Sequence, residues 1–280
     1  MTTSLTEEKI ALLEKKARDV RETIVRMLVA AGSGHTAGPL GMADIFTALY
    51  FHILNHKPDD PLWGGRDRVV LSNGHITPVR YAAMAHAGYF PVEECMTLRK
   101  FGSRLQGHPE RLKLPGLETT SGPLGSGLSQ AAGMAYALRM DGKKSRVYCL
   151  MSDGEQQAGN IWEAAMFAGN NKLSNLVGII DRNNIQINGM TEDTMALEPL
   201  ADKYRAFGWH VLEIDGHNME EIVDATDKAR AIYEKPALIL AHTIPGKGVA
   251  ELEFDFRWHG KTPSKDEAEK FLNAIRTKHS

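Results

Sequence analysis

From Val147 to His242 the sequence alternates short apolar runs with stretches that have helical spacing. The apolar runs VYCLM, NLVGII, HVLEI and ALILAH have the length of buried strands, and segments with the periodicity of a helix lie between them. Strands that alternate with helices form a parallel sheet, because each helix returns the chain to the start of the next strand. The predicted fold class is therefore α/β, a doubly wound and mostly parallel sheet with helices on both faces.

The rest of the chain is predicted to belong to the same single domain, which would span residues 1–280. No internal repeat or interdomain linker interrupts the sequence. The segment 101–123 is irregular and contains several Gly and Pro residues, and such long loops are often functional. The other predicted elements are helices over about 5–31, 42–54, 129–140 and 265–278, and a strand from Val69 that runs into a loop at His75.

Composition excludes several classes of function. The net charge is −2 and no long block of like charge is present, so neither nucleic acid nor an anionic membrane is an expected partner. No apolar stretch is long enough to cross a bilayer, and the first residues lack the pattern of a signal peptide. The two cysteines lack metal-ligand spacing, and Cys149 lies in an apolar run, so we expect a buried, reduced thiol there and a cytoplasmic protein.

Two oxygen-bearing side chains follow neighbouring strands of the predicted sheet. Asp153 ends one apolar run, and Asn183 follows the next run at the equivalent place, one βαβ unit of roughly 30 residues later. Ligands of open α/β sheets bind outside the carboxyl ends of the strands, where this carboxylate and amide would meet. Oxygen ligands suit Mg²⁺ or Ca²⁺, and Gly154 and the start of the next helix would admit a diphosphate.

The same residues also have a purely structural interpretation. Asp153 would cap the following helix, and Asn183-Asn184 would form a turn. On spacing alone the two interpretations are equally good. A dinucleotide-binding loop at Gly125-Ser126-Gly127 is rejected, because the third glycine is missing and the preceding segment is a poor strand.

The stretch from Met151 to Gly189 resembles the thiamin-diphosphate motif, which opens on Gly-Asp-Gly and closes on a pair such as Asn-Asn. Further segments narrow the resemblance to the N-terminal domain of the transketolase family. Together they cover nearly the whole chain in the family's order, which makes the resemblance specific. These segments are SGHTAGPLGMADI (33–45), RDRVVLSNGH (66–75), QGHPE (106–110), ETTSGPLGSGLSQAAGMA (118–135) and GKGVAELEFDFRWHG (246–260).

The resemblance implies thiamin diphosphate as the cofactor, held through Mg²⁺, with Ca²⁺ or Mn²⁺ as other suitable ions. The implied metal ligands are Asp153, Asn183 and the backbone carbonyl of Ile185. The diphosphate would contact some of the cofactor-binding residues, and a glycine-proline loop would face the aminopyrimidine ring. The implied cofactor-binding residues are His75, Gly122, Pro123, Leu124, Gly154, Asn183 and His259.

The resemblance also implies catalytic roles for His35, His108 and His259, which would bind sugar hydroxyls and assist proton transfer. Histidine suits this task because its ordinary pKa lies near neutral pH. A histidine outside such a motif is more often structural, and Lys247 is expected to be a solvated loop residue. The histidines to which we assign a structural or surface role are His52, His56, His86, His210, His217, His242 and His279.

In the transketolase family the second domain supplies the aminopyrimidine pocket and most sugar-phosphate contacts. The resemblance therefore implies a partner, a second transketolase subunit with the pyrimidine-binding and C-terminal domains, in an α2β2 assembly. We expect this chain to be inactive without that subunit. Together they would transfer a two-carbon ketol unit from a ketose phosphate to an aldose acceptor, as in pentose phosphate metabolism.

Some positions depart from the family pattern. Thr36-Ala37 replaces Pro-Gly, Ser152 replaces a glycine, and Ala158 stands where transketolases carry a glutamate that links two cofactor sites. Glu155 is nearby, but we do not assign that role to it. The departures leave three alternatives open: a deoxyxylulose-phosphate-synthase-like enzyme, a 2-oxoacid dehydrogenase α subunit, and a non-catalytic cofactor-binding scaffold.

Overall fold

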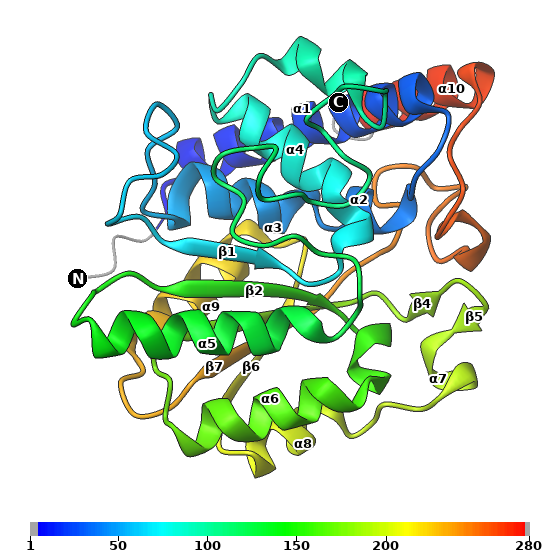
Figure 1. Ribbon diagram of the computed structural model, residues 1–280. Coiled ribbons are helices and arrows are strands. Elements are labelled where there is room, and N and C mark those ends of the chain that lie inside the picture. The colour runs from blue at the N-terminus through cyan, green and yellow to red at the C-terminus, as the bar shows by residue number, and fades with distance from the viewer. Residues whose placement is uncertain (1–4, 278–280) are drawn as a thin grey trace.

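A computed structural model describes residues 5–277 and contains a central sheet of five parallel strands. The strand order is β1-β2-β3-β7-β6, so the chain winds outward in both directions from the middle of the sheet (Figure 1). This arrangement confirms the predicted α/β class with a mostly parallel sheet. The strands are β1 (Arg68–Leu71), β2 (Val147–Ser152), β3 (Leu176–Arg182), β6 (His210–Asp215) and β7 (Ala237–His242).

Helices cover both faces of the sheet, as the sequence predicts. In Figure 1, helices α1, α3 and α4 lie above the sheet and α5, α6 and α8 lie below it. Helix α9 packs on the same face as α3, and α10 packs along α1. The bounds are α1 (Glu7–Ala31), α2 (Ala37–Gly41), α3 (Ala43–Ala48), α4 (Thr77–His86), α5 (Ser126–Met140), α6 (Gly159–Asn170), α8 (Leu200–Ala206), α9 (Met219–Ala231) and α10 (Lys265–Thr277).

Strand β2 shows why the sheet needs a layer on each face. All of its side chains are buried, and alternate residues enter different clusters. Tyr148 and Leu150 join the cluster under α1, α3, α4 and α9, whereas Cys149 and Met151 join the cluster under α5, α6 and α8. Successive side chains of a strand point to opposite faces, so an apolar run without alternation requires two apolar layers.

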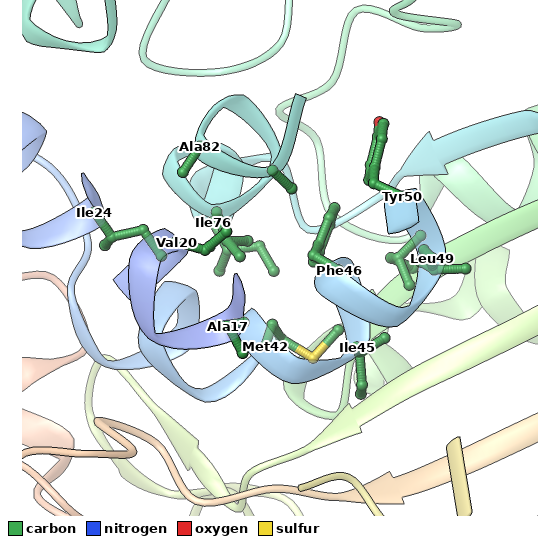
Figure 2. Packing of buried hydrophobic residues seen from close by; sticks show 14 of the residues in the cluster. Ala17, Val20, Ile24, Met42, Ile45, Phe46, Leu49, Tyr50, Ile76 and Ala82 are labelled. Carbon is green, nitrogen blue, oxygen red and sulfur yellow. The ribbon is translucent and has the colours of Figure 1, made fainter. Parts of the chain in front are cut away.

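The larger cluster is built mainly on the N-terminal helices. Figure 2 shows Val20 and Ile24 of α1 beside Ile76, with Met42 and Phe46 next to them. The second cysteine, Cys95, is buried in this cluster, in a 3-10 segment at Val92–Thr97. Each layer of the molecule therefore contains one buried free cysteine.

The predicted helix over 42–54 is divided in the structure. Helix α3 ends at Ala48 and continues as a π-helical turn over Leu49–Ile53, and the short α2 precedes it. Helix α4 was not predicted, because every residue from Thr77 to Ala85 is buried and no polar face marks the helical period. The C-terminal helix has the predicted start, and its predicted end at 278 lies outside the described residues.

The strand register brings the carboxyl ends of the central strands to one edge. Ser152 pairs with Asp181, and Arg182 pairs with His242. A small antiparallel hairpin, β4 (Ile185–Gln186) and β5 (Gly189–Met190), and the helix α7 (Thr191–Thr194) extend from this edge (Figure 1). Over residues 5–277, no helix has the length and apolar character needed to cross a membrane.

Candidate active site

A cavity of about 370 Å³ lies at the carboxyl ends of the strands. Loops that follow α1, β1, β2 and β3 contribute to its wall, together with the loop before α5 and the segment that ends at His259. Most of the residues implied by the motifs therefore converge on one cavity. Its lining residues are His35, Gly38, His75, His108, Gly122, Leu124, Ser152, Gly154, Glu155, Gln157, Asn183, Ile185, Gln186, Ile187, Asn188 and His259.

Three histidine rings form a triangle in the wall of this cavity. The ring centroids of His35 and His75 are 4.8 Å apart, those of His75 and His259 are 5.2 Å apart, and those of His35 and His259 are 5.5 Å apart. His108 lines the same cavity from the irregular loop. The four histidines come from distant parts of the sequence, so only the tertiary fold brings them together.

Burial keeps these histidines neutral near pH 7. It lowers the pKa of His35 to about 4, with a further contribution from His259, Arg99 and His108. Burial also holds the pKa of His75 well below its ordinary value and lowers the pKa of His259. A neutral imidazole has one donor and one acceptor nitrogen, and buried Nδ1 of His35 has no protein partner, so it is available to a ligand.

Asp153 is fully buried beneath Gly154 and does not itself line the cavity. Its carboxylate accepts hydrogen bonds from the backbone N–H groups of Gly154 and Asn184, both at 2.7 Å, and pairs with Arg182 at 3.0 Å. Burial raises its pKa, although Arg182 opposes that shift. The carboxylate is therefore fixed against the peptide that follows Asn183.

Asp181, which the sequence interpretation did not assign to the site, orients Asn183. Asn183 Nδ2 donates to Asp181 at 2.8 Å, and Asn183 Oδ1 accepts from the Ile185 N–H at 3.0 Å. Asp181 also accepts from the Thr243 hydroxyl, and burial raises its pKa to about 7. Because the amide nitrogen is held by Asp181, the amide oxygen faces the other way. The place of Asp181 at the end of an apolar run was the signal available in the sequence.

The donors at this edge fit a hard cation that arrives with phosphate. Asp153, Asn183 and the Ile185 carbonyl provide only oxygen atoms, which Mg²⁺ and Ca²⁺ prefer. Within residues 5–277, no group of three or more His, Cys, Asp and Glu side chains is arranged to hold a metal. The protein would therefore supply part of the coordination, and phosphate oxygens or water would supply the rest.

The glycine-rich loop before α5 forms another wall of the cavity. Gly122 and Leu124 line it, whereas Pro123 is exposed and does not. Gly125 has φ +86°, and a Cβ at this position would lie 2.2 Å from Asn160 Oδ1. Only glycine fits there, so the loop is pressed against the start of α6.

The carboxylate of Glu155 is a further part of the site that the motifs did not assign. It is buried beside Ser72 and Ser152, and burial raises its pKa to about 7. Ala158 begins α6 without a side-chain cap. No pattern in the sequence indicates the Glu155 contacts, since Ser72 is distant along the chain.

The fold and this cavity define a thiamine diphosphate-binding α/β domain. Residues 14–278 match the family described as "Transketolase, thiamine diphosphate binding domain", and the chain belongs to this transketolase family. It is 44% identical over 238 residues to the 6-deoxy-6-sulfo-D-fructose transketolase subunit SqwG of Clostridium sp. (strain MSTE9), covering 85% of this chain and 86% of that protein. It is 42% identical to one of the apulose-4-phosphate transketolase subunits of Phocaeicola vulgatus, covering 96% and 94% of the two chains.

Solved structures agree with the assignment. The transketolase of Campylobacter jejuni superposes with a TM-score of 0.90 at 36% identity, covering 95% of this chain but 43% of that one. The chain thus matches nearly the full length of the two subunit proteins and less than half of this transketolase. The predicted relationship to the N-terminal domain of transketolase is confirmed.

Proposed function

We propose that this chain is the N-terminal subunit of a two-subunit transketolase. It would bind the metal-diphosphate end of thiamin diphosphate and take part in transfer of a two-carbon ketol unit from a ketose phosphate to an aldose. The observation that carries the proposal is the convergence of the strand-end oxygen donors and four histidines on one cavity. The chain would act as a single domain in the cytoplasm.

Each group in the cavity has a proposed task. Asp153, Asn183 and the Ile185 carbonyl hold Mg²⁺, and Gly154 admits the diphosphate close to the backbone. His75 and His259 hydrogen-bond the diphosphate. When bound, the cofactor supplies the carbanion chemistry, and the protein supplies positioning and hydrogen bonds.

The substrate side of the cavity is assigned to His35, His108 and His259. Because burial keeps His35 and His259 neutral, each ring can donate to one sugar hydroxyl and accept from another, or move a proton at the reacting carbon. Gly122, Pro123 and Leu124 face the aminopyrimidine side. The exposed Pro123 would make its contact through the partner-facing surface of that loop.

The partner is a second subunit that carries the pyrimidine-binding and C-terminal domains, in an α2β2 assembly. The names of the two relatives as transketolase subunits support this partner. Those names specify a sulfonated sugar and a sugar phosphate, which supports an anionic sugar as the substrate here. Without its partner the chain should be inactive.

The test is reconstitution with the product of a neighbouring gene that encodes the missing domains. Thiamin diphosphate and Mg²⁺ are titrated calorimetrically into this chain, into the partner and into the mixture, and ketol transfer is assayed from a ketose phosphate. Tight binding and transfer only in the mixture would support the proposal. Absence of both from the mixture would contradict it.

Ala158 favours one second candidate, a deoxyxylulose-phosphate-synthase-like enzyme, because that position lacks the linking glutamate. The same mixture distinguishes the two when a 2-oxoacid replaces the ketose phosphate as donor. Product formation from the 2-oxoacid alone would favour the second candidate. Cofactor binding without turnover of either donor would favour a scaffold.

A further inference from the structure

Glu155 joins three separate segments at the edge of the cofactor cavity. It lies in the 3-10 turn Gly154–Gln157, directly after Asp153-Gly154, and only 1% of its surface is exposed. Its carboxyl group faces inward, toward the ends of β1 and β2 and toward the loop before α5. A carboxylate is rarely buried to this extent unless its oxygens are satisfied.

Both oxygens of Glu155 are occupied. Oε1 accepts from the Ser72 hydroxyl and from the Gly125 N–H at 3.2 Å. Oε2 accepts from the Ser152 N–H at 3.0 Å and from the Ser152 hydroxyl at 3.3 Å. Ser72 Oγ in turn accepts from the Gly127 N–H at 3.1 Å, so the network reaches the first turn of α5.

The loop before α5 has no space on the side that faces this network. A Cβ on Gly127 would lie 2.4 Å from the Ser72 side chain, and a Cβ on Gly125 would meet Asn160. The other side of the loop is open, since a Cβ on Gly122 would meet nothing within 4 Å, and Gly122 and Leu124 line the cavity. Glu155 therefore fixes the inner side of a loop whose outer side faces the ligand.

We infer that Glu155 is a positioning residue, which ties the Gly122–Gly125 loop to the ends of β1 and β2 and so forms one wall of the cofactor cavity before the cofactor binds. The inference rests on the proposed function of that cavity as the thiamin diphosphate site. The inward orientation also separates Glu155 from the glutamate role that Ala158 lacks, because a carboxylate with four internal donors is not free to contact another subunit.

The variant E155Q tests the inference with almost no change in shape. An amide has one oxygen, so its NH₂ group must face either the Gly125 N–H or the Ser152 N–H, and one backbone donor loses its acceptor. We expect amide hydrogen exchange at residues 125–127 of the cofactor-free protein to become faster. In the reconstituted mixture we expect the Kd for thiamin diphosphate with Mg²⁺ to rise about tenfold or more.

S72A is a milder second variant, which retains three of the four donors to Glu155. It should accelerate exchange at the same amides to a smaller extent. It keeps the inference testable if E155Q does not fold.

Y204F is the matched control for a general loss of stability. The buried Tyr204 hydroxyl donates to Gln156 Oε1 at 2.7 Å, so the variant removes a hydrogen bond from the adjacent residue of the same turn, away from the cavity. We expect a lower Tm, with unchanged exchange at residues 125–127 and an unchanged Kd.

Wild-type exchange at residues 125–127 in both E155Q and S72A would overturn the inference. So would an equal rise in Kd in Y204F at a matched loss of Tm. Failure of the wild-type mixture to bind thiamin diphosphate would contradict the proposed function instead, and the exchange measurement on the cofactor-free protein would still decide the role of Glu155.

Discussion

Arg182 shows how much of the site depends on a single buried cation. Its side chain is 4% exposed and pairs with Asp153 at 3.0 Å, Glu192 at 2.6 Å and Glu198 at 2.9 Å. It therefore connects the candidate metal ligand at the end of β2 with the segment that follows the β4–β5 hairpin. The charge of Asp153 is balanced from within the protein.

R182M should destabilise the fold by about 3–5 kcal/mol, because it leaves the buried carboxylate of Asp153 without its cation. The free energy of unfolding in urea measures the effect. E198Q is the control, since Glu198 is 55% exposed and removal of its charge should cost less than about 1 kcal/mol. Equal losses in the two variants would contradict the special role of the buried pair.

D153A should abolish Mg²⁺-dependent binding of thiamin diphosphate while the fold survives. The physical reason is that the only carboxylate among the candidate metal ligands is lost. Calorimetric titration of the reconstituted mixture measures binding, and circular dichroism checks the fold. Unchanged binding would rule out the ligand assignment.

The neutral state of His35 predicts a loss of stability in acid. Its pKa is lowered from 6.5 to about 4 in the folded protein, so the unfolded chain binds the proton more readily. The stabilisation is fully present above pH 6.5 and is lost as the pH falls toward 4. H35Q should show a shallower fall of the urea midpoint between about pH 7 and pH 4.5 than the wild type. Identical slopes would indicate that His35 is already protonated in the fold.

At the scale of elements, the regular part of the fold was predictable and the helical N-terminal part was less so. The strands from Val147 to His242 repeat with a clear period, whereas α4 is buried all round and the 42–54 segment changes helix type. The predicted pairing of strand ends is found in the structure. The contacts of Glu155 and Arg182 could not be predicted, because their partners are brought in by distant segments.

Helix α5 offers two glycines with opposite expectations. G125A should destabilise the protein by about 1–3 kcal/mol, because alanine at φ +86° is strained and its Cβ would clash with Asn160. G133A should stabilise it by about 0.5–1 kcal/mol, because Gly133 lies inside the helix and nothing lies within 4 Å of an added Cβ. Thermal unfolding measures both, and shifts of the same sign would contradict the argument.

At the scale of the whole molecule, apolar side chains surround the mouth of the cavity. Leu124 is 44% exposed and Ile187 is 67% exposed, and both line the cavity. Met195 is 55% exposed, and its carbonyl accepts from the cavity residue Gln157 at 2.8 Å. These residues define a rim that a second subunit would cover if the proposed assembly is correct.

I187E should weaken association with the second subunit by about tenfold or more, because a charge would be buried at the rim. Y233E is the control, since Tyr233 is 80% exposed in the connection before β7, at the opposite edge of the sheet. Calorimetric titration of this chain with its partner measures both. Equal affinities would place the partner elsewhere.

The two buried thiols provide separate reporters for the two layers of the molecule. Burial raises the pKa of Cys95 to about 12 and the pKa of Cys149 well above its ordinary value, so neither reacts readily in the closed fold. Cys95 becomes reactive only when the layer of α1, α3 and α4 opens, and Cys149 only when the layer of α5, α6 and α8 opens. Pulse alkylation followed by peptide mass spectrometry would therefore time the opening of each layer in the natural sequence, without a label or a substitution.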